Sequence, residues 1–153
     1  MTAWTLKKKH VLVPIDFSTA SRRALQVAKD FVEDDSGITA LHVVYPPVPP
    51  VPSLVVPEPD PNRMLENSRN ALQTMLEAEG LGGVKAIVQL GNPASVIVDH
   101  AADHRVDMVV MPTHGRKGVS RWLLGSVAER VIRGCHCPVL LLRTSPEDED
   151  EQG

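Results

Sequence analysis

The chain has 153 residues, 42% hydrophobic and 23% charged, with a formal net charge of −3. This length and apolar content suit one globular domain and exclude wholesale disorder, while two cysteines are too few for a disulfide scaffold. No apolar run reaches the roughly 18 residues of a membrane span, and the small negative charge argues against nucleic-acid binding. An apolar run of only about six residues follows Lys7–Lys9, too short for a signal-peptide core, so we expect a cytoplasmic protein.

Five short, β-branched-rich runs predict strands. Three of them are nearly continuously apolar, which is typical of parallel strands covered on both faces, and the second and third are weaker. In chain order the predicted strands are His10–Ile15, Ile38–Tyr45, Val84–Leu90, Val106–Met111 and Pro138–Leu142.

Amphipathic stretches between these runs predict four helices. The first follows a cap at Ser18 or Ser21 and carries Ala24, Leu25, Ala28, Phe31 and Val32 at helical spacing. The second carries Met64, Leu65, Ser68, Leu72, Met75 and Leu76 and ends at Gly80. The third opens at Asn92-Pro93 and runs to about His104, and the fourth opens at Gly125 or Ser126, turns Val127, Val131 and Ile132 inward and stops at Gly134.

Alternating strands and helices predict an α/β fold, a doubly wound five-stranded parallel sheet with helices on both faces and a strand order like 3-2-1-4-5. In such a sheet, ligands bind beyond the carboxyl ends of the first and fourth strands, where the winding reverses. Residues 14–18 and 111–126 are therefore the expected ligand-binding segments.

Two segments fall outside this pattern. Residues 46–61 are proline-rich and predict an extended excursion, either a plain surface loop or a lid or docking arm. Residues 147–151 are all acidic and predict a disordered tail over 147–153, which leaves one domain over 1–146. Without these five acids the net charge becomes +2, so the charge of the predicted domain does not oppose binding of a nucleotide.

The fourth connection has the composition of a phosphate-binding loop. It combines glycines with Arg116, Lys117 and Arg121 and then enters a helix, whose N-terminus offers backbone N–H donors and a positive dipole end. Neither G-x-x-x-x-G-K-[ST] nor a G-x-G-x-x-G after the first strand is present.

Asp16 follows the first strand and should face the same crevice. Its carboxylate could bond a ribose or a base, or hold a magnesium ion that bridges phosphates. The alternative is an Asx-turn that shapes the entry into the first helix.

These residues resemble the universal stress protein family over about residues 8–143. ATP-binding members carry a glycine, two residues, a second glycine, nine residues and then Gly-Ser or Gly-Thr, a spacing that Gly115 and Gly125-Ser126 match. Residues 13–18, 41–44, 127–131 and 137–140 also resemble the family. Pro112 stands where the pattern has its first glycine, and it removes an N–H and fixes φ.

The resemblance implies an adenine nucleotide alpha hydrolase-like fold with bound ATP, ADP or AMP, and with magnesium possible through Asp16. The implied nucleotide-binding residues are Pro14, Ile15, Asp16, Val43, Met111, Pro112, His114, Gly115, Arg116, Lys117, Gly118, Gly125, Ser126 and Val127. Pro14, Asp16 and Val43 would line the adenine and ribose side, Met111 would lie beside the base, and Gly115–Gly118 would hold phosphates. No catalytic residue is implied.

Other polar residues carry weaker signals. Cys135-His136-Cys137 provides two sulfurs, too few for a tetrahedral metal site, so we expect structural packing. His42 and His114 could serve as acid or base, but no nucleophile and base pair is readable, and His114 is the one nearer the phosphate loop.

Three functions follow. The first is a nucleotide-binding stress or signalling protein whose ligand state changes which partner proteins it engages. Its last strand (Val139, Leu140, Leu141, Leu142) is an apolar edge, and the resemblance implies a homodimer paired there. The second is a dimeric scaffold that binds no nucleotide, which Pro112 favours. The third is a slow ATPase, for which the sequence shows no dedicated base.

Overall fold

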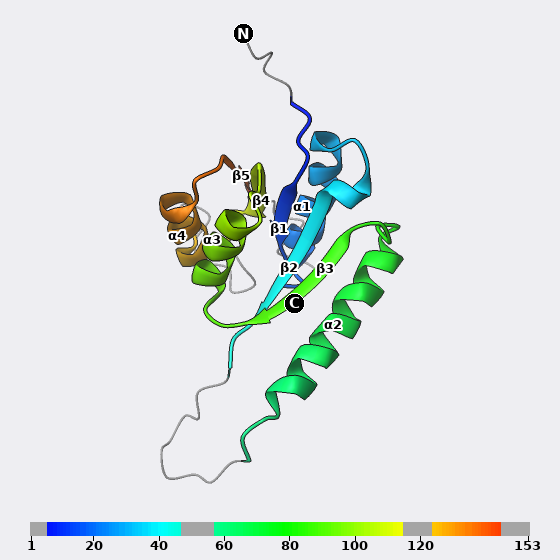
Figure 1. Cartoon of the computed structure of the whole chain (residues 1–153), viewed down its shortest axis with the longest axis vertical. Coiled ribbons are helices and arrows are strands. Elements are labelled where there is room, and N and C mark those ends of the chain that lie inside the picture. Colours follow the sequence, from blue (N-terminus) through cyan, green and yellow to red (C-terminus); the bar gives the residue numbers. More distant parts are fainter. Residues whose placement is uncertain (1–5, 47–56, 115–123, 145–153) are drawn as a thin grey trace.

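The computed structural model describes residues 6–46, 57–114 and 124–144. Five parallel strands form one sheet in the order β3-β2-β1-β4-β5, which confirms the predicted topology (Figure 1). The strands are β1 (Val11–Pro14), β2 (Ile38–Val44), β3 (Lys85–Leu90), β4 (Met108–Pro112) and β5 (Val139–Leu142). The helices are α1 (Thr19–Ala28), α2 (Pro61–Ala78), α3 (Pro93–Asp103) and α4 (Ser126–Gly134), with short 3-10 turns η1 (Lys29–Phe31) and η2 (Asp35–Gly37).

The helices divide between the two faces of the sheet. α1 and α2 cover one face and α3 and α4 cover the other, as the right-handed crossovers of a doubly wound sheet require (Figure 1). Val11 and Val13 of β1 point to the first face and Leu12 to the second, and all three are fully buried. The continuous apolar run is thus explained by a strand that is covered on both sides.

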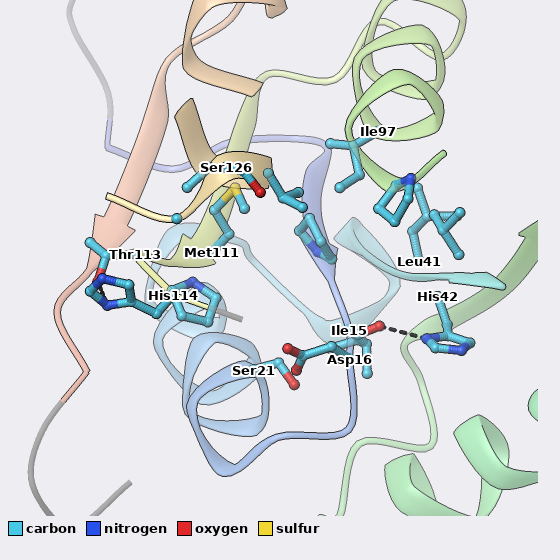
Figure 2. Close-up of a pocket in the computed structure, with 17 residues that line it drawn as sticks. Ile15, Asp16, Ser21, Leu41, His42, Ile97, Met111, Thr113, His114 and Ser126 are labelled. Carbon is cyan, nitrogen blue, oxygen red and sulfur yellow. Dashed lines mark hydrogen bonds between the residues drawn. The ribbon is translucent and has the colours of Figure 1, made fainter. Parts of the chain in front are cut away.

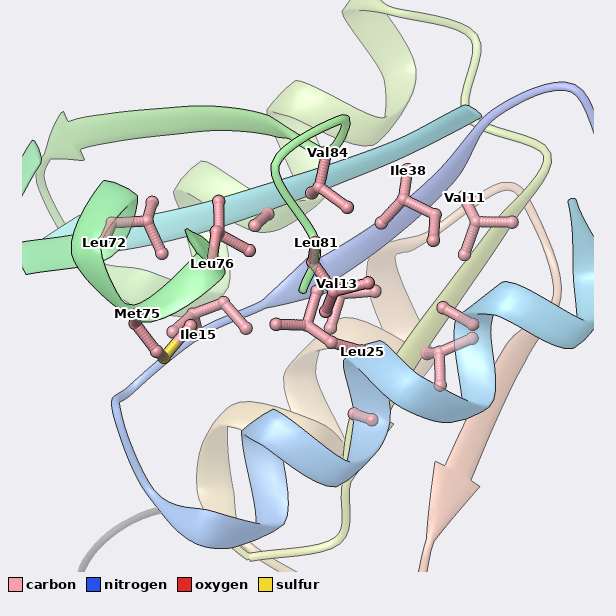
Figure 3. Packing of buried hydrophobic residues seen from close by; sticks show 14 of the residues in the cluster. Val11, Val13, Ile15, Leu25, Ile38, Leu72, Met75, Leu76, Leu81 and Val84 are labelled. Carbon is pink, nitrogen blue, oxygen red and sulfur yellow. The ribbon is translucent and has the colours of Figure 1, made fainter. Parts of the chain in front are cut away.

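Each face has its own core. On the first, the strand valines pack with Leu25 of α1 and with Leu72 and Leu76 of α2 (Figure 3). On the second, Ile97 of α3 and Val131 of α4 pack against the sheet. Burying such side chains stabilises the fold by about 1.5–3 kcal/mol each, before the entropy of ordering them is counted.

The capping signals in the sequence correspond to observed helix ends. Ser18 caps α1 by accepting from the Ser21 N–H at 3.1 Å, and Asn92 caps α3 by accepting from the Ser95 N–H at 3.2 Å. Gly80, just past α2, has φ +71, a conformation that glycine adopts at little cost.

Three expectations need correction. The α-helix of the first connection ends at Ala28, because η1 tightens the last turn and Val32 is extended, although Val32 is still buried. Pro61 is the first residue of α2 rather than the end of the excursion, since a proline fits the first helical turn. Ile132 is 42% exposed instead of inward, because it lies about 100° around the helix from the buried Val131.

Some predicted segments lie outside the described residues. These include 47–56 of the proline-rich excursion and the acidic residues 147–151 with the rest of the tail. Among the described helices, none combines the length and apolar character needed to cross a bilayer. The cytoplasmic location stays a prediction from the sequence.

Candidate functional site

A cavity of about 500 Å³ lies at the carboxyl ends of β1 and β4, where the strand order reverses (Figure 2). Its volume is in the range of small-molecule pockets. Apart from two histidines, Asp16 is the only described lining residue with an ionisable side chain. The lining residues are Pro14, Ile15, Asp16, Ser21, Leu41, His42, Val43, Pro93, Ile97, Met111, Pro112, Thr113, His114, Gly125, Ser126, Val127 and Ala128.

Asp16 lies in the turn between β1 and α1. Its Oδ1 accepts a hydrogen bond from the Ser18 N–H at 3.0 Å and another from the Ser18 hydroxyl. The same hydroxyl accepts from the Ser21 N–H as the cap of α1. The Asx-turn left open by the sequence is therefore present, and its carboxyl group also lines the cavity. Both interpretations of Asp16 are compatible, because one oxygen can hold the turn while the group faces a ligand.

The β2 side contributes Leu41, His42 and Val43. The Ile15 N–H continues the β1–β2 ladder by donating to the Leu41 carbonyl at 2.8 Å, and the Ile15 carbonyl accepts from His42 Nδ1 at 2.7 Å (Figure 2). The imidazole also lies against the ring of Phe17, with centroids 4.6 Å apart. His42 thus contacts both residues that flank Asp16 in the chain.

Pro112 ends β4 and is buried at the cavity wall. The Thr113 N–H donates to Leu142 of β5 at 2.9 Å, so the alternation of a strand turns the Pro112 nitrogen toward the β1 side. The β1–β4 register runs only from Val11↔Met108 to Leu12↔Val109, and has ended before this point. The proline therefore removes no ladder bond, and what it lacks is an N–H on the cavity side.

His114 follows Thr113 and is buried, with 6% of its surface exposed. Its Nδ1 lies 3.3 Å from the hydroxyls of both Thr113 and Thr144. These contacts hold the imidazole ring beside the cavity. His114 is the last described residue before residues 115–123.

Gly125 lines the cavity where the backbone before α4 comes close to the backbone of Thr113. Its N–H donates to the Thr113 carbonyl at 2.8 Å, and a Cβ added at Gly125 would lie 2.8 Å from the same oxygen. Gly125 is also the N-cap of α4, without a side-chain cap bond. The first turn of α4, from Ser126 to Ala128, lines the cavity and directs its N–H groups and positive dipole end there.

The structure brings together every described residue of the predicted nucleotide set at this cavity. Gly115, Arg116, Lys117 and Gly118, together with Arg121, lie outside the described residues. The sequence reasoning did not include Ser21, Leu41, His42, Pro93, Ile97, Thr113 and Ala128 among the binding residues. Proximity in sequence to Val43, His114 and Val127 could have indicated four of these, but Pro93 and Ile97 reach the cavity only through tertiary packing of α3.

The cysteines lie away from the cavity. Cys135 and Cys137 are free thiols packed against the core of the second face. Burial raises the pKa of Cys135 to about 11 and also raises that of Cys137, which favours the protonated, unreactive thiol. Across the described ranges, no three His, Cys, Asp or Glu side chains form a group that could hold a metal ion.

Known proteins resemble this chain in sequence and fold. The model of the universal stress protein family matches residues 8–143. Universal stress protein MJ0531 of Methanocaldococcus jannaschii is 35% identical over 142 residues, covering 88% of this chain and 82% of that protein. The solved structure of hypothetical protein MJ0577 has a TM-score of 0.69 and 27% identity, covering 90% of this chain and 96% of that one.

Two further solved structures share the fold at lower identity. A universal stress protein in complex with cAMP has a TM-score of 0.60 and 22% identity, covering 91% of this chain and 99% of that one. A family protein from Arabidopsis thaliana with AMP bound has a TM-score of 0.58 and 17% identity, covering 92% of this chain and 94% of that one.

Proposed function

Because this chain belongs to the universal stress protein family, we propose that it binds an adenine nucleotide in the cavity at the carboxyl ends of β1 and β4. The observation that carries the proposal is that this cavity is lined by all the described residues that the family resemblance predicts to bind the nucleotide. The cAMP and AMP complexes of two proteins with this fold support the ligand class. ATP, ADP and AMP are the candidate ligands.

The lining suggests how the ligand would be bound. Val43 and Met111 offer apolar contacts for the base, and Asp16 offers a carboxylate to the ribose hydroxyls. Phosphates would lie at the N-terminus of α4, where N–H groups and the helix dipole favour anions. Asp16 carries the only carboxylate among the described lining residues, so it is the residue that would hold a magnesium ion at the phosphates.

Nucleotide binding would then act on the connection between β4 and α4. Thr113 and His114 precede its undescribed part and Gly125 and Ser126 follow it, and all four line the cavity. A ligand that binds one state of the protein more tightly than another shifts their populations. We propose that partner proteins distinguish these states.

The test starts from purified protein that is denatured and cleared. We expect adenine nucleotide in the supernatant, and calorimetric binding of ATP, ADP or AMP that GTP does not reproduce. Asp16→Ala removes a charged hydrogen-bonding group and should weaken binding about 10- to 100-fold. Asp30→Ala, at the surface and distant in sequence, is the matched control. An empty supernatant together with no binding of any adenine nucleotide would refute the proposal.

A dimeric scaffold without nucleotide is the second candidate, and Pro112 favours it. The missing N–H faces the cavity, where the family motif has a glycine. If Pro112→Gly creates nucleotide binding in a protein that otherwise has none, the scaffold function is correct. If wild type and Pro112→Gly both bind, the scaffold function is excluded.

In either case we propose a homodimer paired through β5. All four residues of this edge strand are only half-buried, and an uncovered apolar edge is a liability. Pro138 and Leu142 direct their carbonyls to β4, so the N–H of Leu141 faces outward. Leu141→Pro should therefore yield a monomer of 16.7 kDa by light scattering, while wild type and Leu141→Val show about twice that mass. A monomeric wild type would refute the dimer.

A further inference from the structure

The side chain of His42, on β2, forms a hydrogen bond with the backbone that follows β1. The backbone register of β1 and β2 ends at Pro14↔Leu41, and the chain then leaves the sheet toward α1. At this point the imidazole of His42 supplies the bond to the Ile15 carbonyl, at 2.7 Å. A carbonyl only accepts, so the hydrogen lies on Nδ1 whether the ring is neutral or charged.

The second contact of His42 is with Phe17, the residue that follows Asp16 in the chain. Phe17 has φ +64, a strained conformation that is uncommon for a residue with a bulky side chain. Its ring packs on the imidazole of His42, 4.6 Å between centroids and tilted by 57°. This packing offsets part of the cost of the left-handed conformation.

Asp16 lies between these two contacts. Its carboxyl group is fixed from the α1 side by Ser18 and lines the cavity. The imidazole of His42 contacts both neighbours of Asp16, through the hydrogen bond to Ile15 (Figure 2) and the ring contact with Phe17. We propose that His42 is a positioning residue of the nucleotide site, which holds the Ile15–Phe17 turn so that the Asp16 carboxylate is directed into the cavity. This inference rests on the proposed nucleotide binding for its functional consequence, but not for the geometry.

Two substitutions separate the two contacts, and a third is the control. His42→Asn places an amide N–H near the position of Nδ1 and loses the ring. His42→Phe keeps a ring against Phe17 and loses the donor. His10→Phe is the control, because His10 lies at the other end of β1, where its Nε2 is 2.9 Å from Thr39 Oγ1.

Affinity for the nucleotide bound by wild type is measured first. We expect about 10-fold weaker binding for His42→Phe, rescue to within about threefold for His42→Asn, and no change for His10→Phe. In an Asp16→Ala background, His42→Phe should cause less than about twofold further loss, since residues that act through each other are not additive. Wild-type affinity of His42→Phe, or a full further loss in the Asp16→Ala background, would overturn the positioning role.

A second measurement works without any nucleotide. Amide chemical shifts of Phe17 and Ser18 in the ligand-free protein should change in His42→Phe and return toward wild type in His42→Asn, while unfolding midpoints confirm that both variants fold. Unchanged shifts would overturn the inference. If the shifts behave as expected but wild type binds no nucleotide, the proposed function fails and the positioning of the turn stands.

Discussion

His42 and His114 at the carboxyl end of the parallel sheet and His100 at its amino end have opposite environments. At the carboxyl end, His42 and His114 line the cavity and each has hydrogen-bonding contacts, to the Ile15 carbonyl and to two threonine hydroxyls. At the amino end, His100 of α3 is 3% exposed and neither of its ring nitrogens has a hydrogen-bond partner among the described residues. It stacks instead on His104, 3.9 Å between centroids.

The two histidine environments suit different roles at the two ends of the sheet. Hydrogen bonds at the carboxyl end fix the directions of polar groups around a cavity, as a binding site requires. The amino end uses an imidazole as a flat apolar group in a core, which suits its neutral form only. α3 joins the two, since Pro93 and Ile97 line the cavity and His100 lies on the next turn after Ile97.

The largest expected effect is acid sensitivity from His100. Burial, together with the electrostatic effects of His104, His10 and Lys85 and against the opposing effect of Asp103, lowers the pKa of this residue from 6.5 to about 4. On α4, Arg133 forms an ion pair with Glu129, and Arg130 donates to Asn92.

The unfolded chain therefore takes up this proton near pH 6.5, while the folded protein does so only near pH 4. Stability that is present above pH 6.5 is lost as the pH falls, by roughly 3 kcal/mol at pH 4. Urea unfolding of wild type and His100→Leu between pH 7 and pH 4 measures this, and the two free energies should diverge as the pH falls. His136→Gln, at an exposed histidine, should follow wild type. Parallel curves for wild type and His100→Leu would contradict the assignment.

The next effect tests the close approach at the carboxyl end. Gly125→Ala places a Cβ 2.8 Å from the Thr113 carbonyl and should destabilise the protein by about 1–3 kcal/mol. Because Thr113 and Gly125 both line the cavity, nucleotide affinity should fall as well. Chemical denaturation and calorimetry measure the two effects.

Gly82→Ala is the matched control. Its Cβ would meet nothing within 4 Å and its φ is not in the left-handed range, so stability should stay within about 1 kcal/mol of wild type. Equal effects of the two substitutions would show that the approach of Gly125 to Thr113 does not constrain the site.

The fold could be predicted from the sequence because its signals are local. Continuous apolar runs such as Val11–Pro14 identify buried parallel strands, and Ser18 and Asn92 mark helix starts by hydrogen bonds within four residues. With alternating strands and helices, the handedness of crossovers leaves few topologies. The prediction that Ile132 faces inward was wrong, because a step of one residue along a helix turns the side chain by about 100°.

The lining of the candidate site can be predicted from the sequence only as far as the motifs extend. Asp16 and Gly125 belong to motifs, whereas Ile97 reaches the cavity through the packing of α3 on the sheet. The role of His42 depends on a side-chain bond between residues 27 positions apart, which no periodicity reveals. The lack of hydrogen-bond partners for the ring nitrogens of His100 among the described residues likewise becomes visible only once its neighbours in space are known.

The smallest effect compares two helix caps, one at the site and one away from it. Ser18 caps α1 and also donates to Asp16, whereas Asp60 caps α2 by accepting from the Asn62 N–H at 3.0 Å and is exposed. Removal of either cap by alanine should cost about 1 kcal/mol, measured by thermal or chemical unfolding.

Only Ser18→Ala should also weaken nucleotide binding, by a few fold, because the Asp16 carboxyl then keeps the Ser18 N–H at 3.0 Å but loses the hydroxyl. Asp60→Ala should leave affinity unchanged at the same loss of stability. If both variants lost affinity equally, general stability rather than the direction of Asp16 would control binding. If only Ser18→Ala weakens binding, the turn between β1 and α1 must couple the cap of α1 to the direction of the Asp16 carboxyl group in the cavity. This coupling of hydrogen bonds to a cavity distinguishes the carboxyl end of the sheet from the amino end.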